Sequence, residues 1–246
     1  MPHDYFGESV AATYDDHLGA KSDPAELTHT VDLLAELAGD GAALELAIGT
    51  GRVAVPLHAR GVPVHGVDLS EAMLARLRSK PGAADIGVTV GDMAHVRVAG
   101  TFRLVYLVFN TLMNLTDQGE QVACFETAAA HLEPGGAFVV EVMVPELQRL
   151  PQGERFRPFD VSDGHLGFDE YDVVNQGLVS HHWTVRDDGV HVGAIPFRYV
   201  WPAELDLMAR ISGLRLSDRW AGWDRSPFTA ESRSHVSVWV KAETPT

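Results

Sequence analysis

Residues 42–54 read AALELAIGTGRVA, an apolar run that ends in a glycine loop and leads into a helical pattern. The run predicts a strand from Ala42 to Ala47, and the segment from Arg52 to Arg60 predicts a helix. Gly49 and Gly51 let the backbone approach a ligand closely, and the free amides at a helix N-terminus attract negative charge. This succession of strand, loop and helix predicts a site for a nucleotide-like cofactor.

Short apolar runs continue to alternate with segments of helical period, which is the pattern of βαβ units that build a parallel sheet. Further strands are predicted at residues 62–67, 86–90, 103–109 and 137–143. Helices are predicted after Ser70, a favourable N-cap, and at residues 118–132. Beyond Pro145 the pattern changes to β-branched and aromatic runs, which predict antiparallel strands at 166–174, 178–186 and 190–200. A helix from Pro202 and strands at 214–223 and 236–240 follow.

These predicted elements divide one domain, residues 1–246, into four parts. We expect an N-terminal lid, a cofactor-binding core, a β-rich substrate cap, and a C-terminal helix with strands that complete the sheet, at residues 1–30, 31–145, 146–200 and 201–246. Because the predicted strands of the core are almost continuously apolar, helices should cover both faces of the sheet.

The composition excludes several classes of protein. The chain has 34 acidic and 19 basic side chains, and its formal charge at pH 7 is −15. This acidic surplus argues against nucleic acid and anionic membranes as partners, because both need a basic surface. Cys124 is the single cysteine, which excludes an internal disulfide and fits a reducing compartment. The N-terminus lacks the features of a signal peptide, so we expect a soluble, cytoplasmic protein.

Carboxylates at three positions narrow the choice of cofactor. Asp68 follows Gly49 by 19 residues and ends the second strand, where a carboxylate can accept both hydroxyls of a ribose. Taken alone, this pattern also matches the GxGxxA loop of dinucleotide-binding proteins. Glu45, within the first strand, would repel a pyrophosphate but attract the ammonium group of an amino-acid cofactor. Asp92, between Gly91 and Met93, lies where an adenine would be bound.

Together these residues resemble the class I S-adenosylmethionine-dependent methyltransferases of small-molecule, N-methyltransferase-like type. The resemblance rests on Glu45 to Gly51, on Val67 to Ser70 with Met73, on Gly91 to Met93, and on Leu132 to Gly136. It implies an α/β fold: a seven-stranded, mostly parallel, doubly wound sheet of Rossmann-like methyltransferase type, with an inserted antiparallel β cap.

The resemblance also implies roles for individual residues. The backbone around Gly49 and Gly51 would lie against the methionine part of S-adenosylmethionine, while Asp68 would bind the ribose and Asp92 the adenine amino group. Where the family often has glycine, this chain has Ala47, whose methyl group we expect to be tolerated. The complete predicted cofactor set is Glu45, Ala47, Gly49, Thr50, Gly51, Arg52, Asp68, Leu69, Met73, Gly91, Asp92, Met93, Val108 and Phe109.

Candidate substrate residues follow from the strand ends and from the cap. Ligands of open α/β sheets bind outside the carboxyl ends of the strands, which favours the segment after the fourth strand. Tyr5 and Tyr14 resemble the lid aromatics of small-molecule methyltransferases. The predicted substrate-binding set is Tyr5, Tyr14, Asn110, Asn114, Arg198, Tyr199 and Trp201.

Tyr14 and His181 are the predicted catalytic residues. Methyl transfer from a sulfonium mainly needs alignment and a water-poor pocket, and a base is optional for an amine acceptor. His181 and His182 point to opposite faces of one strand, so at most one of them can face the pocket. The histidines lack the spacing of an HExxH zinc site, so we expect no metal.

The sequence therefore favours methyl transfer to a small molecule, more readily to an amine nitrogen than to a hydroxyl, by a monomer or homodimer. Two alternatives stay open at this point. An NAD(P)-dependent oxidoreductase would use the same glycine loop and Asp68, although Glu45 argues against it. A non-catalytic S-adenosylmethionine-binding protein would keep the cofactor site without an open substrate pocket.

Overall fold

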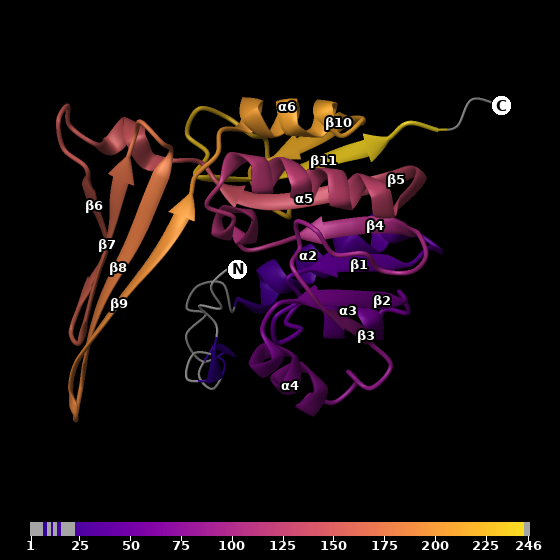
Figure 1. Cartoon of the computed structure of the whole chain (residues 1–246), viewed down its shortest axis with the longest axis horizontal. Coiled ribbons are helices and arrows are strands. Elements are labelled where there is room, and N and C mark those ends of the chain that lie inside the picture. Colours follow the sequence, from indigo (N-terminus) through magenta and orange to yellow (C-terminus); the bar gives the residue numbers. More distant parts are fainter. Residues whose placement is uncertain (1–6, 9–10, 12–13, 16–22, 244–246) are drawn as a thin grey trace.

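The computed structural model describes residues 7–8, 11, 14–15 and 23–243, and it contains a helix-covered central sheet and a separate cap sheet (Figure 1). The central sheet has seven strands in the order β10-β11-β5-β4-β1-β2-β3. Its members are β1 Ala43–Leu46, β2 Val64–Asp68, β3 Gly87–Val90, β4 Phe102–Leu107, β5 Leu132–Met143, β10 Leu214–Trp220 and β11 Ser234–Lys241. Only β11 pairs antiparallel with both neighbours, β5 and β10, so the predicted mostly parallel, seven-stranded sheet is confirmed.

Helices cover both faces of this sheet. One hydrophobic cluster joins the sheet to α2 Pro24–Ala38, α3 Ala54–Ala59 and α4 Glu71–Ser79. The other joins it to α5 Gln118–His131 and α6 Pro202–Ile211. Polar N-caps begin three of these helices: Asp23, Ser70 and Asp117 each accept a hydrogen bond from the first turn that follows. The sheet is thus doubly wound, as its apolar strands predict. None of the described helices is long and apolar enough to cross a membrane.

The cap is a four-stranded antiparallel sheet, β6-β7-β8-β9. Its strands are β6 Phe156–Ser162, β7 His165–Asp172, β8 Gly177–Arg186 and β9 Gly189–Arg198. In Figure 1 it projects beside the central sheet and is joined to it through η4, Glu146–Arg149, and through the end of β9. The sequence predicted three of these strands and missed β6, where Pro158 and a bulge before Asp160 interrupt the alternation.

Many strand boundaries differ from those predicted by a few residues; the largest difference is at the start of β5, and the one at the end of β4 bears on the site. β5 begins at Leu132 instead of residue 137, because Leu132 already pairs with Phe102 across the sheet. β4 ends at Leu107 instead of Phe109. The reason is that Phe109 and Asn110 have φ values of 67° and 61°, which turn the chain into the short helix η3, Thr111–Asn114.

Candidate active site

The glycine loop lies at the carboxyl end of β1 and adopts left-handed backbone conformations. Gly49 and Gly51 have φ values of 57° and 77°, and a Cβ atom on Gly51 would lie 2.2 Å from Leu77 Cδ1 of α4. Glycine is therefore required at 51 both by conformation and by space. Ala47 has a φ of 56°, so the residue that replaces the family's glycine is itself left-handed. Such a conformation costs an alanine on the order of 1 kcal/mol relative to glycine.

Asp68, at the end of β2, holds the glycine loop against α4. Its Oδ2 accepts a hydrogen bond of 2.7 Å from the Gly49 amide, and its Oδ1 accepts one of 2.8 Å from the Ser70 amide. The Asp68 backbone carbonyl accepts from the Gly91 amide of the next segment at 2.9 Å. Asp68 thus connects the segments that follow β1, β2 and β3, which is where the sequence placed the ribose.

The segment after β3 supplies the predicted adenine side of the site. The Asp92 carboxylate accepts a hydrogen bond of 2.9 Å from the Ala94 amide, which fixes the turn. Met93 is half-buried and packs against the hydrophobic core, whereas Leu69, after β2, is exposed. Because β2 and β3 pair in parallel up to Asp68 and Val90, these apolar side chains and Asp92 follow adjacent strand ends.

Glu45 is a buried carboxyl group inside β1. It is 2% exposed, and its Oε2 accepts a hydrogen bond of 2.9 Å from the Tyr106 hydroxyl of β4. Burial raises the pKa of Glu45 to about 8, although Tyr106 and the positive charge of Arg52 oppose that rise. At neutral pH, Glu45 is therefore protonated, and a cationic group that approaches it would favour its ionised form.

The turn after β4 is held by a carboxylate that the sequence did not single out. The Glu141 side chain of β5 accepts a hydrogen bond of 2.8 Å from the Phe109 amide, and its backbone carbonyl accepts one of 3.2 Å from Asn110. In return the Asn110 side chain accepts a 2.6 Å hydrogen bond from the Met143 amide. Val108 is buried, and the Arg52 guanidinium lies 5.1 Å from the centre of the Phe109 ring. Left-handed residues held in this way often occur at functional sites.

Removal of the Glu141 carboxylate is expected to destabilise this turn. Glu141→Ala leaves the Phe109 amide without its acceptor in a half-buried position, which should lower the free energy of unfolding by about 1–3 kcal/mol. Urea denaturation measures the change. Glu141→Gln keeps an oxygen acceptor and should lose clearly less; equal losses in the two variants would contradict this role.

Tyr14 connects the N-terminal part of the chain to the same edge of the sheet. Burial raises the pKa of its phenol, and the charged groups around it are Arg52, Asp68, Asp15 and Glu45. The neighbouring Asp15 accepts a hydrogen bond of 2.6 Å from the Thr50 hydroxyl and pairs with Lys80 at 2.6 Å. Tyr14 therefore lies among the predicted cofactor residues, whereas Tyr5 and most of the predicted lid lie outside the described residues.

Three predicted substrate residues at the base of the cap have structural partners. Arg198 is buried and donates to the Gln121 and Glu204 side chains at 2.6 and 2.7 Å, which joins β9 to α5 and α6. Tyr199 is buried in the hydrophobic core, and Trp201 is half-buried against it. These contacts explain how the cap is attached, and a role of these three residues toward substrate stays a prediction.

Asn114 and His181 have different surroundings. The Asn114 Oδ1 atom is buried and has no hydrogen-bond partner among the described residues. His181 Nε2 lies 3.1 Å from Glu170, and its ring stacks on Phe168 with centroids 4.9 Å apart. His181 lies on the opposite face of β8 from Leu178, which packs into the core. Its predicted catalytic role is thus not supported by a contact with the site and stays a prediction.

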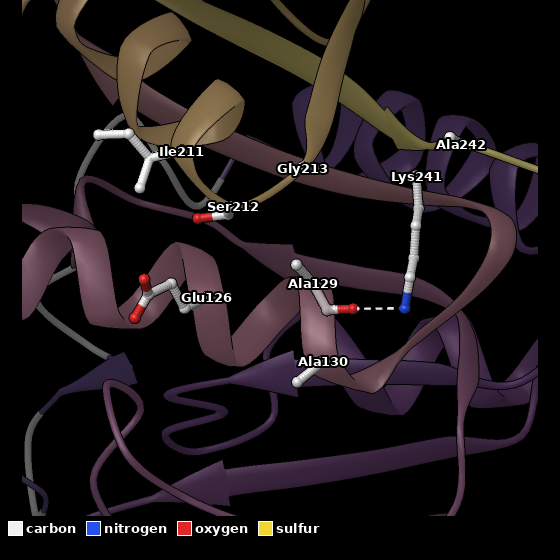
Figure 2. A pocket seen from close by; sticks show the side chains of 8 residues that line it. All are labelled: Glu126, Ala129, Ala130, Ile211, Ser212, Gly213, Lys241 and Ala242. Atoms are coloured by element: carbon white, nitrogen blue, oxygen red, sulfur yellow. Dashed lines mark hydrogen bonds between the residues drawn. The ribbon is translucent and has the colours of Figure 1, made fainter.

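A shallow surface depression lies elsewhere, between the ends of α5, α6 and β11 (Figure 2). The Lys241 ammonium beside it donates to the carbonyls of Ala129 and Leu132 at 2.8 and 2.7 Å, which satisfies the C-terminal end of α5. This depression is near the amino end of β5, opposite the glycine-loop edge, so it is not part of the candidate site.

Within the described ranges, no three His, Cys, Asp or Glu side chains are grouped so that they could hold a metal ion.

The residues at the glycine-loop edge fit a nucleoside cofactor with an amino-acid tail. The loop has left-handed glycines beside α4, and the carboxylates of Asp68 and Asp92 lie at the ends of β2 and β3. The buried carboxyl group of Glu45 lies beneath the loop. The fold and the site thus define an S-adenosylmethionine-dependent methyltransferase, and S-adenosylmethionine is its cofactor.

Comparison with known proteins agrees with this class. Residues 43–136 match a family described as a methyltransferase domain. Over 203 residues the chain is 30% identical to cypemycin N-terminal methyltransferase from a Streptomyces species, which covers 79% of this chain and 81% of that protein. The chain therefore belongs to the S-adenosylmethionine-dependent methyltransferase family.

Two further relatives extend the comparison. The solved structure of the CcbJ methyltransferase from Streptomyces caelestis superposes with a TM-score of 0.86, at 37% identity, over 97% of this chain and 98% of that chain. The dTDP-3-amino-3,4,6-trideoxy-alpha-D-glucopyranose N,N-dimethyltransferase of Streptomyces venezuelae is 32% identical over 127 residues, 51% of this chain and 53% of that protein. The similarity to CcbJ includes the cap and the C-terminal strands as well as the cofactor core. Because these relatives are methyltransferases, the alternative of an NAD(P)-dependent oxidoreductase is set aside.

Proposed function

We propose that this enzyme transfers the methyl group of S-adenosylmethionine to an amine nitrogen of a small molecule. The observation that carries the proposal is the similarity to two relatives whose names specify an amine acceptor, a peptide N-terminus in one and a 3-amino sugar in the other. The cofactor supplies an electrophilic methyl group on a positively charged sulfur. The protein binds and aligns both reactants and excludes water, which favours an in-line displacement.

Roles for the individual residues follow from where they lie. The glycine loop, Glu45, Asp68 and Asp92 would hold the cofactor, with Leu69 and Met93 against its adenine. Tyr14 approaches the same edge, and its protonated phenol can donate a hydrogen bond to a ligand. Asn110 and Asn114 follow β4, where the acceptor would be bound, and the free Oδ1 of Asn114 suits an N–H donor. The cap would set specificity.

A transfer assay with a panel of acceptors tests the proposal. The purified chain is incubated with radiolabelled S-adenosylmethionine and with amino sugars, sugar nucleotides that carry an amine, peptides with free N-termini, and matched hydroxyl compounds in place of the amines. We expect label to enter at least one amine and none of the matched hydroxyl compounds. Transfer only to hydroxyls, or binding of S-adenosylhomocysteine without any transfer, would contradict the proposal.

The compartment and the assembly also remain proposals. The single cysteine, Cys124, is buried, and burial raises the pKa of its thiol. A chain with one cysteine forms no internal disulfide, which fits the reducing cytoplasm. We propose a monomer or homodimer, which light scattering of the purified protein would decide.

Tyr14→Phe separates a role in catalysis from one in cofactor binding. Since the ring is retained, affinity for S-adenosylhomocysteine should stay within a few fold, whereas turnover should fall about tenfold, as for the loss of one hydrogen bond. Calorimetry gives the affinity, and the transfer assay with the amine identified above gives turnover. A large loss of affinity would instead assign the hydroxyl to the cofactor site.

A further inference from the structure

Side chains on one face of the cap sheet form a continuous hydrogen-bonded chain that the proposed site does not use. Asp160 Oδ2 lies 2.6 Å from His165 Nδ1, and His165 Nε2 lies 3.0 Å from His182 Nδ1. His182 Nε2 lies 3.4 Å from the Ser180 hydroxyl, and Ser180 is paired across the sheet with Asp169, whose carboxylate the Ser180 hydroxyl stabilises. We call these five polar side chains of β6, β7 and β8 the cap chain.

The register of the cap sheet shows which way the cap chain runs. Asp169 is paired with Ser180, and the next pair on the same face toward the core is Tyr171 with Leu178. Tyr171 and Leu178 are both buried in the hydrophobic cluster that contains Leu112 of η3. The inner end of the cap chain is therefore one residue pair from the hydrophobic cluster that includes η3, the segment after β4 beside which the acceptor amine is proposed to be bound.

The side chains of the cap chain become more exposed with distance from this inner end. Ser180 is 8% exposed, whereas the His165 and Asp160 side chains are 25% and 42% exposed. Gly167, opposite His182, leaves room for the Phe159 ring, because a Cβ atom at 167 would lie 2.3 Å from Phe159 Cε2. That ring lies 5.3 Å from the His182 ring and shields the middle of the chain. The chain thus leads from a buried end to a water-exposed carboxylate.

The hydrogen bonds allow a proton to move in one direction along this path. When both rings are neutral, His165 donates from Nδ1 to Asp160, and His182 donates from Nδ1 to His165 Nε2. His182 Nε2 then has a free lone pair toward Ser180. A proton that arrives there can be passed on by transfer from His182 Nδ1 to His165, and from His165 Nδ1 to Asp160.

We propose that the cap chain removes the proton that the acceptor amine loses on methylation. An N–H bond of the substrate ammonium breaks and its electron pair stays on nitrogen. The nitrogen would then form the bond to the methyl carbon while the bond from that carbon to the cofactor sulfur breaks and its electron pair stays on sulfur. The proton passes to Asp169 and Ser180, then to His182 and His165, and leaves from Asp160 to water. The inference rests on the proposed function, because it needs an acceptor amine that is bound as an ammonium and must lose a proton before methyl transfer.

The charges around the cap chain support uptake of a proton at its inner end, while the hydrogen bond from His165 lowers the pKa of Asp160, which favours release of the proton to water there. Burial raises the pKa of Asp169, with the Glu146 carboxylate adding to the rise, so Asp169 is a better proton acceptor than an exposed aspartate. Burial lowers the pKa of His182, and the nearby His165 and His181 add to that effect while Asp160 opposes it. Glu146 is itself paired with Arg149 and Arg157, at 3.2 and 3.1 Å. His182 is therefore neutral and ready to accept at neutral pH.

The test compares His182→Asn with His191→Asn. His191 belongs to the same sheet and pairs with Asp188 at 2.8 Å, but it lies outside the cap chain, so it is a matched control. At about pH 6, where an alkyl amine of pKa about 10 arrives as an ammonium, His182→Asn should lower kcat about tenfold. The loss should shrink toward pH 9 or so, where more of the amine is already neutral, and added imidazole should restore part of the rate.

Other outcomes overturn the proposal. An equal loss in His182→Asn at both pH values would indicate a structural role, and no loss would show that the proton leaves by another route. A second measurement needs no substrate: in nitrogen NMR of the purified protein, Asp160→Asn should change the ring-nitrogen signals of both His165 and His182, and a change at His165 alone would contradict a connected path. A wild-type protein that methylates no amine overturns the proposed function and the inference together.

Discussion

Asp68→Ala is expected to reduce the affinity for S-adenosylhomocysteine about 100-fold or more, the largest binding effect that the structure predicts. The carboxylate accepts from the amides of Gly49 and Ser70. It also lies where the ribose hydroxyls are proposed to bind. Hydrogen bonds to a charged group contribute about 1.5–3 kcal/mol each, so loss of two of them accounts for a change of this size. Isothermal titration calorimetry measures the affinity directly.

Two further variants make this result specific. Asp85→Ala removes an exposed carboxylate elsewhere on the same half of the sheet and should bind normally. Asp68→Asn keeps the shape and one acceptor oxygen, so its affinity should fall between those of the wild type and Asp68→Ala. Urea denaturation of all three shows whether the fold is intact. Normal affinity in a folded Asp68→Ala protein would remove Asp68 from the cofactor site.

The central sheet could be predicted because most of its strands can be recognised from their own residues and the residues that directly follow them. β1, β2 and β3 are short, mostly apolar runs that lead into a glycine or a carboxylate, and the helix after β2 begins at the polar cap Ser70. β6 was missed because its strand character depends on pairing with β7, while its own residues include Pro158 and a bulge. The β4 boundary was missed because the left-handed turn at Phe109 is imposed by a distant strand.

The same distinction applies to the candidate site. Asp68 and Asp92 were found because they stand at strand ends, which is a local property. Glu141, Asp15 and Tyr106 were not, because their partners Phe109, Thr50 and Glu45 are 32, 35 and 61 residues away in the sequence. Of these three, only Glu141 could have been recognised from the sequence, since it is the only charged residue between Ala137 and Met143. A lone carboxylate in an apolar strand needs a buried partner.

The structure also shows where some of the surplus acidic side chains lie. Asp32, for example, is exposed and pairs with the cation of Arg60. Glu45, Asp68 and Asp92 instead gather at the cofactor edge, and Asp169 and Asp160 end the cap chain. Acidic side chains at these places suit a cationic cofactor and an amine that must lose a proton, so part of the acidic surplus supports the proposed chemistry.

Glu45→Gln is expected to remove a large pH dependence of stability. The folded protein keeps the Glu45 proton up to a pKa of about 8, whereas the ordinary value is 4.5. Between these values the folded state binds one more proton than the unfolded state, so raising the pH favours unfolding. Each pH unit of the interval lowers the free energy of unfolding by about 1.4 kcal/mol, so the loss across the whole interval is on the order of 5 kcal/mol. Glutamine has no proton to lose and should not show that loss.

Urea denaturation in the absence of cofactor, from about pH 4 to pH 9, measures this difference, because other titrating groups affect both proteins equally. The wild type should lose stability relative to Glu45→Gln as the pH rises through the interval, and the two curves should run parallel above it. Tyr106→Phe removes the hydroxyl that donates to Glu45, which should raise the pKa of Glu45 further and extend the loss to higher pH. Parallel curves for wild type and Glu45→Gln over the whole range would mean that Glu45 is ionised in the folded protein, and that Arg52 or a proton donor compensates for its burial.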